Sequence, residues 1–204
     1  MLKKILSLTL GSVSLFAMHT VELNINDLEL EAAVKLDIGQ FNHNVEPDTT
    51  FIGIAYINAD EEYSENARGA SVDKLGGYFN FNFLMKQEIN NSDLKVGLGV
   101  KAVFASIDKP NLSSYAAIPL GVEVEYTLPV ANMIPISLDA QMYYAPESLS
   151  FSDSKSYFEY RLEANFEVIE RGSLYVGFRN IETNYDSSDY VYNRASYFGF
   201  KFAF

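Results

Sequence analysis

Two pairs of carboxylates are the residues of this chain best suited to acid–base chemistry. Glu123 and Glu125 are separated by one residue, and Glu159 and Glu163 by three. Paired carboxylates can act as a general acid and a general base when a substrate lies between them. They can also neutralise buried basic side chains and so specify how a closed interior packs. We expect this second role here. The expected basic partners are Lys101, Arg161 and Lys201.

Motifs for cofactor or metal chemistry are weak. The chain has no cysteine, which excludes disulfides, thiolate metal sites and cysteine nucleophiles. The stretch VGLGVK (96–101) has two glycines but lacks the third glycine and the following helix of a phosphate loop. Asp60, Glu61, Glu62 and Glu65 do not have EF-hand spacing, and we expect them to lie in a solvated loop. We therefore expect no cofactor, no metal and no catalytic residue.

The composition limits the possible partners. The chain of 204 residues is long enough for one domain. It has 27 acidic and 15 basic side chains, giving a net charge of -12. Such a chain repels the polyanionic backbone of nucleic acid, so we exclude nucleic acid as a partner.

The N-terminus has the pattern of a secretory signal peptide. Its first residues, MLKK, supply a positive charge before the apolar run 5–18, which is shorter than a spanning helix of roughly 20 residues. Leu15 and Ala17 suit cleavage after Ala17. We therefore predict a signal peptide at 1–17 and a mature domain at 18–204.

The elements that must position the charged residues are β-strands. The mature chain alternates with a period of two, so that one parity is apolar and the other is polar or small. The segment YFEYRLEANFEV (157–168) is the clearest case. We predict about ten strands, within a range of eight to twelve. The ten segments are 21–26, 28–39, 51–58, 75–85, 94–106, 117–128, 136–144, 157–168, 174–179 and 197–204.

The connections between these segments alternate in length, as in an up-and-down barrel with short periplasmic turns and longer extracellular loops. The predicted long loops are 58–74, 145–156 and 182–195, and the predicted short turns are 87–93, 129–135 and 170–172. Two connections depart from the rule, because the one near Asp27 is very tight and 41–50 is long for a turn. If the first strand rises from the periplasm, an even number of strands returns the C-terminus to the periplasm.

The charges indicate which parity faces outward. The polar parity collects nine charged residues among several glycines, in strands that we expect to be neighbours. A barrel of about ten strands is narrow enough for side chains to fill it, and small residues leave room for long charged ones. No later stretch is long enough for a spanning helix, so a membrane-embedded chain must form a closed barrel. We predict an all-β, transmembrane antiparallel barrel with apolar side chains towards lipid. The predicted lumen charge network is Lys101, Glu123, Glu125, Asp139, Glu159, Arg161, Glu163, Arg179 and Lys201.

The last strand, YFGFKFAF, ends on an aromatic residue. Phe198, Phe200, Phe202 and Phe204 alternate with smaller or charged residues. This pattern resembles the C-terminal signal that the barrel assembly machinery reads in bacterial outer-membrane proteins. The alternative is a plain edge strand, but an unpaired aromatic edge in water invites aggregation. Tyr126, Tyr144 and Tyr160 are candidates for the aromatic girdles at the membrane interfaces.

The C-terminal part of the chain resembles a known family. The similar stretches are YYAPESLS (143–150), SYFEYRLEANFEVI with Tyr157, Glu163, Ala164 and Asn165, and VGFRNIETNYD. Through these stretches the chain resembles the YfaZ family of outer-membrane proteins, and the similarity is strongest over the last third. The resemblance implies a small outer-membrane barrel and supplies no catalytic set.

Three functions therefore stay open. The leading one is a non-enzymatic barrel of the cell outer membrane with a narrow, charge-filled lumen, and the others are a small porin-like channel and an envelope enzyme acting on lipid or peptide. Omptin-type proteases place Asp and His together on the extracellular rim, whereas His19 lies at the mature N-terminus and His43 in a predicted periplasmic turn. As partners we expect outer-membrane lipid, lipopolysaccharide and the barrel assembly machinery, and we expect a monomer.

Overall fold

The structure is a computed structural model, and it describes residues 19–26, 29–59, 65–66, 75–90, 92–109, 112–129, 134–152, 154–185 and 189–204. The predicted signal peptide (1–17) and three of the acidic loop residues, Asp60, Glu61 and Glu62, lie outside the described residues. In the described ranges, no helix is long and apolar enough to cross a bilayer.

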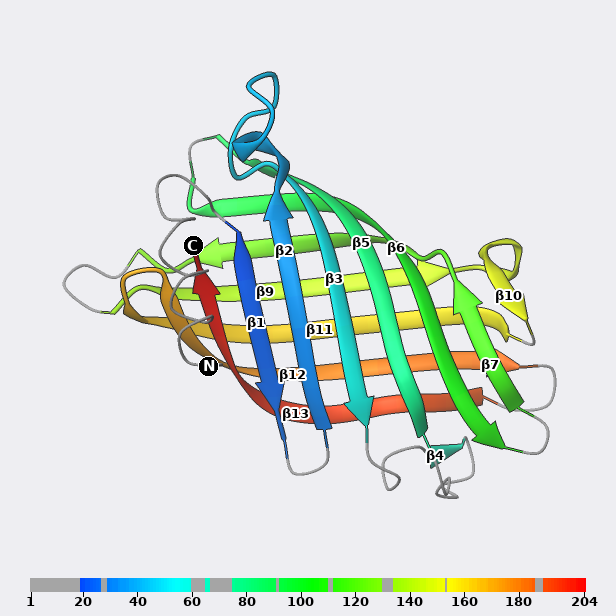
Figure 1. Cartoon of the computed structure of the whole chain (residues 1–204). Helices are drawn as coiled ribbons and strands as arrows, with labels where there is room; N and C mark the ends of the chain where they lie inside the picture. The colour runs from blue at the N-terminus through cyan, green and yellow to red at the C-terminus, as the bar shows by residue number, and fades with distance from the viewer. Residues whose placement is uncertain are drawn as a thin grey trace, which may run out of the picture.

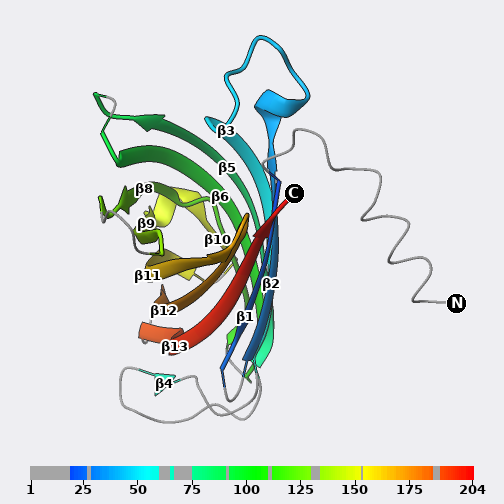
Figure 2. The same cartoon turned by 90° about the vertical axis from the view of Figure 1, so that its left-hand side faces the viewer.

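Ten strands form one closed antiparallel barrel, as the alternation predicts. The barrel strands are β1 (Thr20–Ile25), β2 (Glu29–Asp37), β3 (Thr50–Ala59), β5 (Leu75–Glu88), β6 (Leu94–Lys109), β8 (Leu120–Thr127), β9 (Ile136–Ala145), β11 (Ser154–Ile169), β12 (Gly172–Tyr185) and β13 (Asp189–Ala203). The pairing of β1 with β13 and of β6 with β8 closes the ring. Figures 1 and 2 show the strands curving round a single wall, with β1, β2 and β3 on one side and β8, β9 and β11 on the other.

Five short elements complete the described structure. They are β4 (Glu65–Asn66), β7 (Leu112–Ala117), β10 (Ser150–Ser152) and the 3₁₀ turns η1 (Ile38–Gln40) and η2 (Glu147–Leu149). β4, β7 and β10 lie at one end of the barrel, which we call the loop end (Figure 1). The opposite end, which we call the terminal end, holds the first residues of β1 and the C-terminus.

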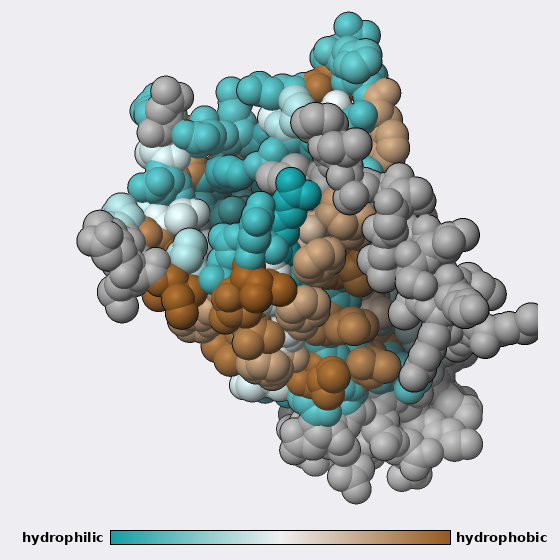
Figure 3. Space-filling view, turned by 60° about the vertical axis from the view of Figure 1, so that its left-hand side comes forward, coloured by the Kyte–Doolittle hydropathy of each residue, from teal (hydrophilic) through white to brown (hydrophobic). Residues whose placement is uncertain are grey.

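Alternation along each strand separates the two faces of the wall. Apolar side chains of one parity are exposed on the outside, and Leu98, Leu162 and Phe198 are each more than half exposed. Figure 3 shows hydrophobic residues gathered on this outer surface, next to hydrophilic residues. The prediction that the apolar parity faces outward is therefore confirmed.

The loops differ from the prediction at two places. The segment 182–195 was expected to be a long loop, but β12 continues to Tyr185 and β13 begins at Asp189. This part of the wall carries a bulge between Ile181 and Glu182. The predicted loop 145–156 contains η2 and β10, and β10 pairs with β7. In both places the strands continue because their polar and aromatic residues face the lumen or pair with a neighbouring strand.

The terminal end is held by contacts between the chain ends. His19 and Phe204 exchange two backbone hydrogen bonds, of 3.1 and 2.8 Å. The His19 ring stacks on Phe41, with 4.9 Å between centroids, and its Nδ1 accepts a hydrogen bond from the Asp37 amide. The connection between β2 and β3, which starts with η1, projects beyond the barrel (Figure 1). The long 41–50 connection noticed in the sequence is thus an ordered extension of the terminal end.

Candidate functional site: the filled lumen

A chain of ion pairs crosses the middle of the lumen. We call it the charge belt, and its members are Glu29, Glu31, Lys101, Glu159, Arg161 and Arg179. Arg161 is its centre, because its Nη2 lies 2.8 Å from Glu31 Oε1 and its Nε lies 2.9 Å from Glu159 Oε1. Lys101 Nζ lies 3.0 Å from the other Glu159 oxygen. Arg179 pairs with both Glu29 and Glu31. These contacts join β2, β6, β11 and β12 across the barrel.

The belt is electrically balanced and dry. It contains three carboxylates and three basic groups, and Glu159 and Arg179 are 0% and 1% exposed. A buried ion is costly unless partners replace its water. The arginines meet this need through several charge-assisted hydrogen bonds each, and Arg179 Nε also donates to Asn193 Oδ1 at 2.9 Å. The belt therefore leaves no unpaired charge that would favour the entry of an ion.

A layer of tyrosines lies between the belt and the loop end. We call it the tyrosine cap, and its members are Tyr78, Tyr115, Tyr157, Tyr190 and Tyr192, each 0–1% exposed. The ring centroid of Tyr115 lies 6.0 Å from that of Tyr157 and 6.1 Å from that of Tyr192. The hydroxyls of Tyr78 and Tyr157 lie 2.7 Å apart, and the Tyr157 hydroxyl donates to Glu159 at 2.8 Å. The cap thus packs directly on the belt.

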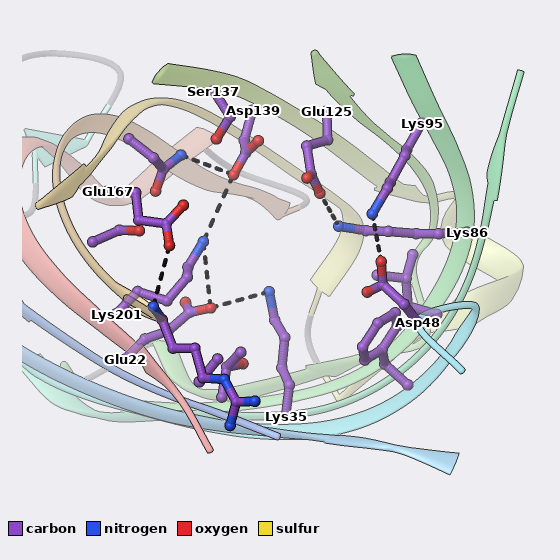
Figure 4. Close-up of a pocket in the computed structure, with 17 residues that line it drawn as sticks. Glu22, Lys35, Asp48, Lys86, Lys95, Glu125, Ser137, Asp139, Glu167 and Lys201 are labelled. Atoms are coloured by element: carbon purple, nitrogen blue, oxygen red, sulfur yellow. Dashed lines mark hydrogen bonds and ion pairs between the residues drawn. The ribbon is translucent and has the colours of Figure 1, made fainter. Parts of the chain in front are cut away.

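The terminal end of the lumen is open. A cavity of about 330 Å³, which we call the vestibule, lies there, and basic and acidic side chains face one another across it (Figure 4). Lys201 Nζ lies 3.7 Å from both Glu22 Oε1 and Asp139 Oδ2, and Lys35 Nζ lies 3.5 Å from Glu22.

Two further pairs line the other wall of the vestibule. Lys86 Nζ lies 3.1 Å from Glu125 Oε2. Lys95 pairs with Asp48, which belongs to the projecting connection between β2 and β3. The vestibule is therefore lined by charges of both signs, with cations and carboxylates already in contact.

The nine residues predicted for the lumen network fall into three positions. Lys101, Glu159, Arg161 and Arg179 are in the belt, and Glu125, Asp139 and Lys201 line the vestibule. Glu123 and Glu163 lie on the lumen side between these levels. Glu123 accepts a hydrogen bond from the Tyr143 hydroxyl at 2.6 Å, and Glu163 accepts one from Tyr197 at 2.7 Å.

The direct ion pairs of the expected carboxylates involve bases inside and outside the predicted set. Glu159 does meet Lys101 and Arg161, but the Glu123 and Glu125 carboxylates lie near Lys86, at 4.0 and 3.1 Å. The cause is position around the ring: β5, which carries Lys86, is separated from β8 by a single strand. The sequence prediction also left out seven charged residues of the lumen and the five tyrosines of the cap, although strand parity places most of them on the polar face. The seven charged residues are Glu22, Glu29, Glu31, Lys35, Asp48, Lys86 and Lys95.

Glycines make room for the rings. A Cβ atom on Gly177 would lie 2.5 Å from the Tyr197 ring, and one on Gly121 would lie 2.4 Å from the Tyr143 ring. Both distances are shorter than two non-bonded carbon atoms allow. A tyrosine ring can therefore lie flat over the neighbouring strand only where that strand has a glycine. The predicted role of small residues therefore extends from long charged side chains to aromatic ones.

The C-terminal phenylalanines lie on the outer wall. Phe198 and Phe200 are 53% and 37% exposed, and the rings of Phe200 and Phe202 stack at 6.4 Å. Phe204 contacts the edge of the His19 ring at 5.9 Å. It stays a prediction that the barrel assembly machinery recognises these residues.

Both histidines lie at the terminal end of the barrel. His19 is buried at the terminal end, and His43 lies in the projecting connection at the same end. Within the described ranges no group of three His, Cys, Asp or Glu side chains is arranged to hold a metal ion. Tyr126 and Tyr144 are 38% and 51% exposed on the outer wall, and Tyr160 packs there between Phe158 and Phe178.

Comparison with known proteins agrees with this architecture. The model of one protein family, described as YfaZ precursor, matches residues 8–204. No curated protein matches the chain. Among solved structures, the outer membrane protease OmpT from Escherichia coli is similar, with a TM-score of 0.51 and 10% sequence identity over 92% of this chain and 93% of that one. At this identity the likeness shows the fold alone.

Proposed function

Because the chain belongs to the YfaZ family and is an outer-membrane β-barrel protein exported through a signal peptide, we propose that it acts without enzymatic chemistry and without conducting solutes. Among the described residues, the belt fills the middle of the lumen, the cap fills it towards the loop end, and the vestibule is open. The protein then forms a stable barrel in the membrane, and its charged vestibule faces the periplasm.

The observation that supports this proposal most is the continuity of belt and cap. Arg161 bonds to Glu31 on β2 and to Glu159 on its own strand β11, so the belt spans the lumen. The Tyr157 hydroxyl ties the cap to the same Glu159. A solute would have to break several charge-assisted hydrogen bonds in a dry interior before it could pass.

Planar-bilayer recordings test the closed lumen. We expect the refolded wild-type protein to give no steady current. A variant with Arg161→Ala and Tyr157→Ala, which removes one belt side chain and one cap ring, is expected to give openings. Insertion is checked by heat-modifiable migration on gels, since a folded barrel migrates differently before and after boiling. A steady current through the wild-type protein would refute the proposal.

A narrow channel is the second candidate, and the vestibule favours it, because a cavity of about 330 Å³ already forms part of a path. In that case wild-type current would be steady, and it would vanish when Glu123, Glu125 or Arg161 is neutralised. An envelope enzyme is the third candidate. OmpT is described as a protease, but both histidines of this chain lie at the terminal end. Peptide or lipid cleavage by the refolded protein that survives removal of His19 and His43 would support an enzyme of another kind.

A further inference from the structure

A polar cluster interrupts the apolar outer wall near the loop end of β12 and β13. We call it the outer polar cluster, and its members are Asn180, Glu182, Arg194 and Ser196. Asn193 and Ala195, which flank Arg194, are buried on the lumen side, so alternation turns Arg194 outward. Arg194 and Ser196 are exposed. A cationic side chain therefore sits on the face of the barrel that meets lipid.

Among the described residues, no carboxylate oxygen lies within ion-pair distance of the Arg194 guanidinium. Its Nε donates to Asn180 Oδ1 at 2.9 Å, and the Asn180 amide donates in turn to Glu182 at 3.2 Å. Asn180 is 1% exposed, so it holds the guanidinium in place from beneath. Across the described ranges, Arg194 forms no ion pair, whereas both belt arginines do. The two amino groups of its guanidinium remain as a fork of N–H donors suited to an anion such as phosphate.

The position along the strand places Arg194 at a membrane interface. The ten residues from Ala195 to Phe204 separate it from the terminal end, and a tilted spanning strand needs about 9–11 residues. Charged side chains on the lipid face are tolerated best near an interface. If the termini are periplasmic, as the lengths of the connections predict, Arg194 lies at the level of the head groups of the outer leaflet.

An apolar groove begins beside this cluster. It is a shallow depression, wide open to the outside, and it crosses β1, β13, β12, β11 and β9 on the outer wall. Small side chains, Ala164 and Ser196, leave a hollow between larger ones. The apolar lining consists of Ile25, Leu138, Leu162, Ala164, Val176 and Phe198. Ser196, at the groove's edge, is two residues from Arg194 on the same face of β13.

We propose that this groove and Arg194 form a binding site for lipopolysaccharide, with an acyl chain in the groove and a lipid A phosphate on the guanidinium. The choice of ligand follows from the chemistry of the groove and of Arg194. The groove offers apolar surface, and Arg194 offers a guanidinium at the level of the outer leaflet that has no ion-pair partner among the described residues. In that leaflet the lipid that combines acyl chains with phosphate is lipopolysaccharide.

The test measures lipopolysaccharide retained by folded protein purified from outer membranes in mild detergent, by native mass spectrometry. We expect Arg194→Gln to lower retention at least about tenfold, since a charge-assisted pair is lost. The matched control is Arg171→Gln, an exposed arginine in the turn at the terminal end, which should retain as much as wild type. Ala164→Phe, which fills the groove, should also lower retention, and Ala32→Phe, on the outer wall of β2, should not.

A competition experiment needs no variant. Delipidated wild-type protein is offered lipopolysaccharide, the same material with its phosphates removed, or phosphatidylglycerol. Preference for the phosphorylated glycolipid is the expected result. Equal binding of the dephosphorylated form, preference for phosphatidylglycerol, a dimer that buries the groove, or equal retention by wild type and Arg194→Gln would each overturn the proposal.

Discussion

Arg161 is the side chain on which the middle of the lumen depends. Its guanidinium reaches two carboxylates on different strands, and its surroundings exclude water. The pair with Glu31 joins residues 130 positions apart in the chain. The Arg161 side chain thus links β2, near the start of the chain, to β11, near its end.

Replacing Arg161 should therefore destabilise the barrel strongly. Arg161→Met keeps much of the side-chain volume but leaves Glu159 and Glu31 with one cationic partner fewer each. Removing one member of a buried ion pair typically costs about 3–5 kcal/mol. Unfolding in urea from detergent micelles measures the loss, and Arg171→Met at the exposed turn should unfold like wild type. Equal midpoints for both variants would contradict a bracing role for Arg161.

At the scale of the elements, the seam between β1 and β13 closes the ring. Six residues of β1 pair with the end of β13, from Thr20 opposite Ala203 to Ile25 opposite Phe198. Beyond them His19 and Phe204 continue the pairing. The last residue of the chain is thus both the end of the predicted assembly signal and a part of the finished seam.

Phe204→Ala separates these two roles. In refolding from denaturant we expect a small loss of stability, about 0.5–1.5 kcal/mol for one aromatic contact. In cells we expect a much larger fall in the amount of protein that reaches the outer membrane, measured by fractionation and heat-modifiable migration. Phe83→Ala, which removes an exposed ring from β5, should assemble normally. If both variants assemble equally well, Phe204 is not part of a signal.

The strand elements were the most predictable part of the molecule. Most of the barrel strands follow from alternation, because each strand has one face in lipid and one in the lumen, whereas 51–58 was less decisive because both of its faces are apolar or small. The ends of β12 and β13 were missed, since residues such as Tyr190 and Asn193 are polar or aromatic on a face that meets other side chains instead of water. Parity also could not indicate which carboxylate meets which base, because such partners come from strands brought together only by closure of the barrel.

The whole molecule is asymmetric along its axis. The loop end is filled by the tyrosine cap and the terminal end is open at the vestibule. Because the chain has no cysteine, single cysteines can report which parts of the lumen water reaches.

Ser137→Cys, in the vestibule, should react with a membrane-impermeant maleimide in permeabilised cells but not in intact ones, since the vestibule should open to the periplasm. Val103→Cys, in the buried cluster with the cap, should react in neither. Labelled protein is detected by its shift in mass. Labelling of the Ser137 variant in intact cells would mean that the barrel is inserted the other way, and labelling of the Val103 variant would mean that the cap is open to solvent.

The barrel strands also differ in length. β1 has 6 residues and β2 has 9, whereas β11 and β13 have 16 and 15. A tilted spanning strand needs about 9–11 residues, so β1 falls short of this length, whereas β11 and β13, the neighbour of β1, exceed it. Hydrophobic mismatch of this kind is relieved by local thinning of the bilayer. We therefore expect the bilayer to be thinner beside β1 than beside β11.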